Sequence, residues 1–113
     1  MKYAILLLLI PTFFVSAQTF REEEVTFANG ETKLSGTLSF PEGSNKNYRA
    51  IILVSGSGPQ NRDSEFFGFK SFKLLADFLN AQGFAVLRYD DRGFGKSTGK
   101  SVNQSTTANL AED

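Results

Sequence analysis

The chain has 113 residues, enough for one small domain at most. Twelve basic and twelve acidic residues give a formal net charge of zero, which argues against nucleic acid and against electrostatic membrane binding. The chain contains neither cysteine nor histidine. This excludes disulfides, Ser-His and Cys-His catalytic pairs and most transition-metal sites within the chain. We expect neither a metal nor another cofactor.

Residues 1–17 are predicted to be a secretory signal peptide. Lys2 gives a positive start, and an apolar run of about 13 residues follows over 3–15, which is short for a membrane span and usual for a signal-peptide core. Small residues at Val15-Ser16-Ala17 predict cleavage after Ala17, so residues 18–113 would form a secreted or periplasmic domain without stable membrane insertion. An uncleaved anchor is the alternative.

The mature chain is predicted to begin with a β-hairpin. Apolar and polar residues alternate on both sides of Asn29-Gly30, as they do at Val25 and Phe27. Asn-Gly is a strong turn signal because both residues tolerate positive φ. We expect strands over residues 23–28 and 32–40.

A strand–helix–strand unit is predicted next. Residues 50–54 form a continuous apolar run, which is typical of a strand buried on both faces, and residues 84–89 form a second. Between them, residues 66–82 have helical spacing, and Gly83 stands where a helix commonly ends. This order predicts a parallel strand pair.

The predicted helix has two faces. Its apolar stripe consists of Phe72, Leu75, Ala76 and Leu79, and Lys73, Asp77 and Asn80 lie opposite. A further helix is expected to start near residue 109, with Asn109 as its N-cap. The hairpin and the strand–helix–strand unit together predict an α/β fold. Because one helix cannot cover both faces of the sheet, we expect an incomplete domain that exposes apolar surface.

Two catalytic signatures overlap in residues 92–101, RGFGKSTGKS. A phosphate-binding P-loop would need glycine at residue 90, where Asp90 would repel phosphate. The G-x-S-x-G match around Ser97 would need a strand before it, a helix after it and a histidine partner, and the sequence supports none of these. We therefore expect neither a nucleotide site nor a nucleophile at Ser97.

The segments YDDRGFGKS and LVSGSGPQNRD, one after each predicted buried strand, resemble two loops of α/β-hydrolase-fold enzymes. The first is similar to the D-x-R-G-x-G-x-S loop after their fourth strand. The second is similar to the loop after their third strand, where many members carry H-G-G-G or H-G-x-P. The ordered pair resembles secreted bacterial enzymes of the esterase and serine-aminopeptidase-like group. The resemblance covers about residues 25–97 and implies the N-terminal part of an α/β-hydrolase fold.

The resemblance implies that the backbone N–H of Ser57 is an oxyanion-hole donor. Gly56 and Gly58 would let the backbone approach a substrate closely. Ser55 departs from the family pattern, because histidine is frequent there. A plain strand-to-helix turn is the alternative for this loop.

The loop from Asp90 to Ser97 is expected to support the site. Arg92 would pair with Asp90 or Asp91, and Gly93 and Gly95 would permit a sharp bend. A solvated charge cluster is the alternative. Arg62 and Asp63 are expected to belong to a charged surface loop rather than to a cleft entrance.

The resemblance further implies a serine hydrolase that cleaves carboxylic esters or amides in small-molecule or peptide substrates. Its nucleophile, acid and histidine would lie downstream of residue 113, so this chain alone is expected to be inactive. The alternative is a small secreted α/β binding module without catalytic activity.

Overall fold

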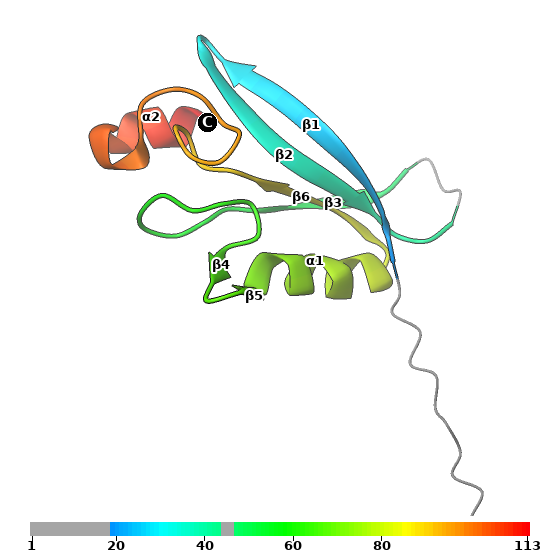
Figure 1. Ribbon diagram of the computed structural model, residues 1–113. Coiled ribbons are helices and arrows are strands. Elements are labelled where there is room, and N and C mark those ends of the chain that lie inside the picture. The colour runs from blue at the N-terminus through cyan, green and yellow to red at the C-terminus, as the bar shows by residue number, and fades with distance from the viewer. Residues whose placement is uncertain (1–18, 44–46) are drawn as a thin grey trace, which may run out of the picture.

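The computed structural model describes residues 19–43 and 47–113, and the predicted signal peptide and its cleavage site lie outside these residues. A mixed sheet has the strand order β1-β2-β6-β3 (Figure 1). The elements in chain order are β1 (Arg21–Asn29), β2 (Thr32–Phe40), β3 (Arg49–Leu53), β4 (Glu65–Phe66), β5 (Phe69–Lys70), α1 (Ser71–Ala81), β6 (Phe84–Tyr89), the 3-10 turn η1 (Val102–Gln104) and α2 (Thr107–Glu112).

The predicted hairpin and the parallel pair are both confirmed. β1 and β2 pair antiparallel around the Asn29-Gly30 turn, and β1 extends beyond its predicted bounds at both ends. β3 and β6 pair in parallel, with α1 between them in the chain, and β6 also pairs antiparallel with β2. β6 is therefore the strand that joins the hairpin to the parallel pair.

The prediction that β3 is buried on both faces is wrong. Ile52 is 58% exposed, and Val54, directly after the strand, is 64% exposed. Within the described sheet β3 pairs only with β6, and α1 packs on one face of the sheet (Figure 1). Alternate residues of β3 therefore turn to an uncovered face, in line with the expected exposure of apolar surface.

The sheet face that lies under α1 and the loop after β3 is unusually polar. Ser35, Thr37 and Ser39 of β2 alternate along this face and are all buried. Arg88 of β6 lies opposite Thr37 and is also buried. Buried polar groups require partners. The loop after β3 supplies hydrogen-bond partners for several of these side chains, and these bonds fix the position of the loop on the sheet.

The helix begins later than predicted. Residues 66–69 form a tight hairpin between β4 and β5, in which Phe67 and Gly68 have φ values of 47° and 81°. Two successive residues at positive φ cannot continue a right-handed helix, so α1 starts at Ser71. The C-terminal prediction is confirmed, because the Gly83 amide donates to the Asn80 carbonyl at 3.0 Å.

The predicted faces of α1 are wrong at two positions. Asn80 is 1% exposed and donates its side-chain amide to the Phe84 carbonyl at 2.9 Å, so it closes the turn into β6. Leu75, predicted on the buried stripe, is exposed, as are Leu74 and Phe78. The N-cap of α2 is Thr106 rather than Asn109, which occupies position N3 of the capping box.

Candidate active site

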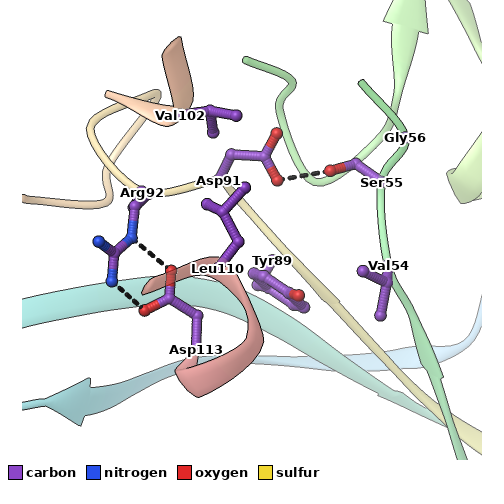
Figure 2. A pocket seen from close by; sticks show the side chains of 9 residues that line it. All are labelled: Val54, Ser55, Gly56, Tyr89, Asp91, Arg92, Val102, Leu110 and Asp113. Carbon is purple, nitrogen blue, oxygen red and sulfur yellow. Dashed lines mark hydrogen bonds and ion pairs between the residues drawn. The ribbon is translucent and has the colours of Figure 1, made fainter. Parts of the chain in front are cut away.

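A small cavity lies at the carboxyl ends of β3 and β6 (Figure 2). Its volume is about 80 Å³. Residues from the strand ends, from η1 and from α2 line it: Val54, Ser55, Gly56, Tyr89, Asp91, Arg92, Val102, Leu110 and Asp113. Ligands of open α/β sheets bind outside the carboxyl ends of the strands, so this is the edge where a site is expected.

The loop after β3 is fastened to the loop after β6 through Asp91. The Ser55 hydroxyl donates to Asp91 Oδ1 at 2.5 Å, and the Gln60 amide donates to Asp91 Oδ2 at 2.8 Å (Figure 2 shows the first bond). The Asp91 amide in turn donates to the Gln60 carbonyl at 3.1 Å. Ser55, which stands where the resembling family often has histidine, therefore supports its loop through a carboxylate.

Ser57 lies between these two fastened ends and is exposed. Among the residues that the structure describes, none accepts a hydrogen bond from its amide. Its carbonyl accepts from the Gln60 side chain at 3.3 Å. A Cβ added at Gly56 or Gly58 would meet no atom within 4 Å, so the outer side of the loop is open. The Ser57 amide can thus donate to a group arriving from solvent.

Asp90 binds Arg62 and not Arg92. Its carboxylate accepts from Arg62 Nε at 3.1 Å and from Arg62 Nη2 at 2.9 Å, and it also accepts from the backbone amides of Arg62 and Lys96. Both side chains are largely buried, at 12% exposure for Arg62 and 5% for Asp90. Burial raises the pKa of Asp90, but the bonds from Arg62 and from the two amides outweigh it and hold the pKa below its usual value.

Arg92 pairs with Asp113, so the predicted pairing with Asp90 or Asp91 is wrong. Its guanidinium binds both carboxylate oxygens of Asp113, with 2.5 Å from Nε to Oδ2 (Figure 2). Asp90 and Asp91 are already bound to the loop after β3, so Arg92 is left to bind the residue that follows α2. This pair and Leu110 hold α2 against the cavity.

Tyr89 lies in the cavity wall between the two parallel strand ends and α2. Burial, together with the negative charges of Asp91 and Asp113, raises the pKa of Tyr89. The phenol is therefore neutral at physiological pH.

Arg62 and Asp63 are not a solvated surface loop, which corrects that expectation. Arg62 is the partner of Asp90, and Asp63 accepts a hydrogen bond from Arg88. Arg88 is 2% exposed and also binds Glu22 at 2.8 Å. The sequence held one signal for this second ion pair, a charged residue inside the otherwise apolar strand FAVLRY.

Ser97 is a buried structural residue in this geometry. Its hydroxyl accepts from the Ser35 amide at 2.9 Å and donates to the Asp90 carbonyl at 2.6 Å. Nearby, the Gly93 amide donates to the Thr98 carbonyl at 3.0 Å, which closes the loop on itself. These bonds fasten the loop after β6 to β2 and use the only proton of the Ser97 hydroxyl, which is buried.

Replacing Ser97 with Ala is expected to lower the free energy of unfolding by about 1–3 kcal/mol, because the buried Ser35 amide loses its acceptor. Urea denaturation followed by circular dichroism measures the change. Ser105→Ala is a matched control, since that hydroxyl only donates to backbone carbonyls of its own turn. Equal effects of the two substitutions would contradict a structural role for Ser97.

Comparison with known proteins agrees with this fold. The sequence model of a family described as "Serine aminopeptidase, S33" matches residues 69–113. Esterase EstD of Thermotoga maritima is 38% identical over 81 residues, which is 72% of this chain and 18% of the esterase. The chain is an α/β-hydrolase segment. Its hairpin and parallel βαβ unit are the N-terminal part of an α/β-hydrolase sheet, as the two loop motifs implied.

In residues 19–43 and 47–113, no group of three or more acidic side chains is arranged to hold a metal ion. Over the same residues, no helix combines the length and the apolar character that crossing a membrane requires.

Proposed function

We propose that the complete protein hydrolyses carboxylic esters or amides with a serine nucleophile, and that this segment supplies the oxyanion loop and the first strands. The observation that carries the proposal is the amide of the exposed residue Ser57, which has no acceptor among the described residues and follows β3 at the carboxyl edge of the sheet. The relationship to an esterase supports the same class of reaction.

For ester hydrolysis, the main requirement on this segment is one well-placed hydrogen-bond donor. When a nucleophile attacks an ester carbonyl, negative charge develops on the carbonyl oxygen, and a fixed N–H aimed at that oxygen stabilises the transition state by roughly 3–4 kcal/mol. The chain contains no histidine to activate a serine. The nucleophile and its partners therefore belong to the part of the protein outside this sequence, and the segment alone is inactive.

The substrate and the location of the enzyme belong to the same proposal. The substrate is a small ester or a peptide, and the enzyme is exported by cleavage after Ala17. N-terminal sequencing of the protein from its native host tests the second point, with Gln18 as the expected first residue. A mature protein that begins at Met1 would contradict export by cleavage.

Replacing Ser57 with Pro is expected to lower kcat for p-nitrophenyl acetate in the complete protein on the order of 100- to 1000-fold, because proline has no N–H. Ser57→Ala is the matched control: it keeps the amide and removes only the hydroxyl, so its kcat should stay near that of the wild type. Urea denaturation of both variants checks that they fold.

The control also separates this role from that of a nucleophile. Loss of activity in Ser57→Ala would show that the hydroxyl acts, and full activity in a folded Ser57→Pro variant would rule out the amide. A complete protein without activity on any ester or amide would overturn the proposed function itself.

A further inference from the structure

We propose that Arg62 is the positioning residue of the oxyanion loop, which holds residues 55–60 in place through Asp90. The inference rests on the proposed function for its catalytic consequence. Its structural part stands on contacts of the described residues alone.

Every N–H of the Arg62 guanidinium has an acceptor. A guanidinium carries five such donors in a rigid planar fork. Nε donates to Asp90, Nη1 to Glu24 at 2.6 Å and to Thr37 at 2.7 Å, and Nη2 to Ser35 at 3.0 Å and to Asp90. The side chain is thereby fixed in one orientation, with no donor left to seek water.

These acceptors come from three other segments of the chain. Glu24 belongs to β1, Ser35 and Thr37 belong to β2, and Asp90 begins the loop after β6. Arg62 itself lies in the loop after β3, which spans residues 54–64. One side chain therefore joins that loop to the hairpin and to the loop after β6.

Two consecutive carboxylates hold the loop at both ends. Asp91 binds it at Ser55 and Gln60, and Asp90 binds it at Arg62 through the side chain and through the backbone amide at 2.8 Å. Ser57 lies between these anchors, and its amide has no acceptor in residues 19–43 and 47–113. This arrangement fixes the direction of a donor without touching the substrate, which is what a positioning residue does.

Lysine could not do the same. Its ammonium group carries the same charge, but its three donors are compact and cannot form a bidentate pair with Asp90 while reaching Glu24 and Ser35. Arg62→Lys should therefore keep the buried charge balanced and the protein folded, and still release the loop. A displacement of about 1 Å at a reacting group can lower a rate by about 100-fold.

The experiment compares Arg62→Lys with Arg21→Lys in the complete protein. Arg21 makes an exposed pair with Glu23 at 3.5 Å and lies 4.1 Å from the centroid of the Phe40 ring, so it controls for the substitution at a site outside the loop. We expect hydrogen exchange of Arg62→Lys to rise in residues 55–62 and to stay unchanged in β6 and α1. For p-nitrophenyl acetate we expect kcat to fall at least 10-fold with KM within about twofold.

Chemical rescue gives a further readout that a general loss of stability would not produce. Arg62→Ala removes the guanidinium, and added guanidinium ion at non-denaturing concentration should restore part of kcat in this variant and not in Arg21→Ala. If Arg62→Ala does not fold, Arg62→Lys alone decides.

Three results would overturn the inference. They are unchanged exchange in residues 55–62, exchange that rises across the whole sheet, and released exchange in the loop with unchanged kcat. A wild-type protein without hydrolase activity would instead contradict the proposed function. The hydrogen-exchange pattern alone would then decide whether Arg62 holds the loop.

Discussion

Replacing Asp90 with Asn should lower the free energy of unfolding by about 3–5 kcal/mol, the range for removing one partner of a buried ion pair. The substitution leaves the Arg62 charge, 12% exposed, without its main counter-ion. It also puts an amide NH₂ where one oxygen now accepts from Arg62 and from the Lys96 backbone. Urea denaturation followed by circular dichroism measures the loss.

Asp77→Asn is the matched control for Asp90→Asn. Asp77 pairs with Lys73 one helical turn away on the surface of α1, at 2.5 Å. Pairs at this i,i+4 spacing on a helix contribute only about 0.3–0.5 kcal/mol, and this one is more exposed than the Asp90–Arg62 pair. Similar losses in the two variants would mean that the Asp90–Arg62 pair is solvated in solution, contrary to its burial.

The same substitution should flatten the dependence of stability on pH. The pKa of Asp90 is lower in the folded protein than the value of about 3.9 that aspartate has in an unfolded chain. A depressed pKa contributes stability that is fully present above the unfolded value and is lost as the pH falls through the folded value. The wild type should therefore lose stability below about pH 4 more steeply than Asp90→Asn.

The sequence was sufficient to predict the local elements. Asn29-Gly30 determines the hairpin, and residues 84–89 match β6 in both bounds, because turn chemistry and continuous apolar runs are properties of neighbouring residues. The predicted start of the helix at residue 66 is wrong, because the local spacing of apolar residues is misleading there. Phe66, Phe67 and Phe69 fit a helical pattern, but the backbone at Phe67 and Gly68 turns the other way.

The ion pairs of the site could not be predicted from the sequence. Arg92 was assigned to its nearest acidic neighbours, whereas its partner lies 21 residues away, and Arg62 binds a carboxylate 28 residues away. Pairing at that distance depends on which strand ends meet in the sheet, and sequence separation carries no information on it. The two loop motifs located the site, and the tertiary structure determined which charges meet there.

The polar face of β2 links these observations. Ser35, Thr37 and Ser39 alternate as a solvent-facing pattern would, yet all three are buried. Ser35 and Thr37 accept hydrogen bonds from Arg62, and the Ser35 amide donates to Ser97. A strand that appears amphipathic in the sequence therefore has two buried faces, one of them polar. The polar side chains bind the loop after β3, and the backbone of the same strand binds the loop after β6.

Replacing Gly95 with Ala is expected to destabilise the protein by about 2–5 kcal/mol, through strain and a clash. Gly95 has φ of 55°, a left-handed conformation that costs about 1–2 kcal/mol for residues with a Cβ. A Cβ there would lie 2.7 Å from Cγ and Oδ2 of Asp90. Asp90 cannot move away, because Arg62 and two backbone amides hold its carboxylate.

Gly30→Ala separates the two causes. Gly30 has nearly the same φ, 57°, but an added Cβ would meet no atom within 4 Å. Its substitution should cost only the conformational term of about 1–2 kcal/mol. The excess in Gly95→Ala, measured by urea denaturation, then reports how rigidly Asp90 is held. If Asp90→Asn is made first, that excess should shrink, because the loosened side chain can yield to the methyl group. Equal losses in Gly30→Ala and Gly95→Ala would contradict a fixed Asp90, and with it the anchoring of the loop that carries Ser57.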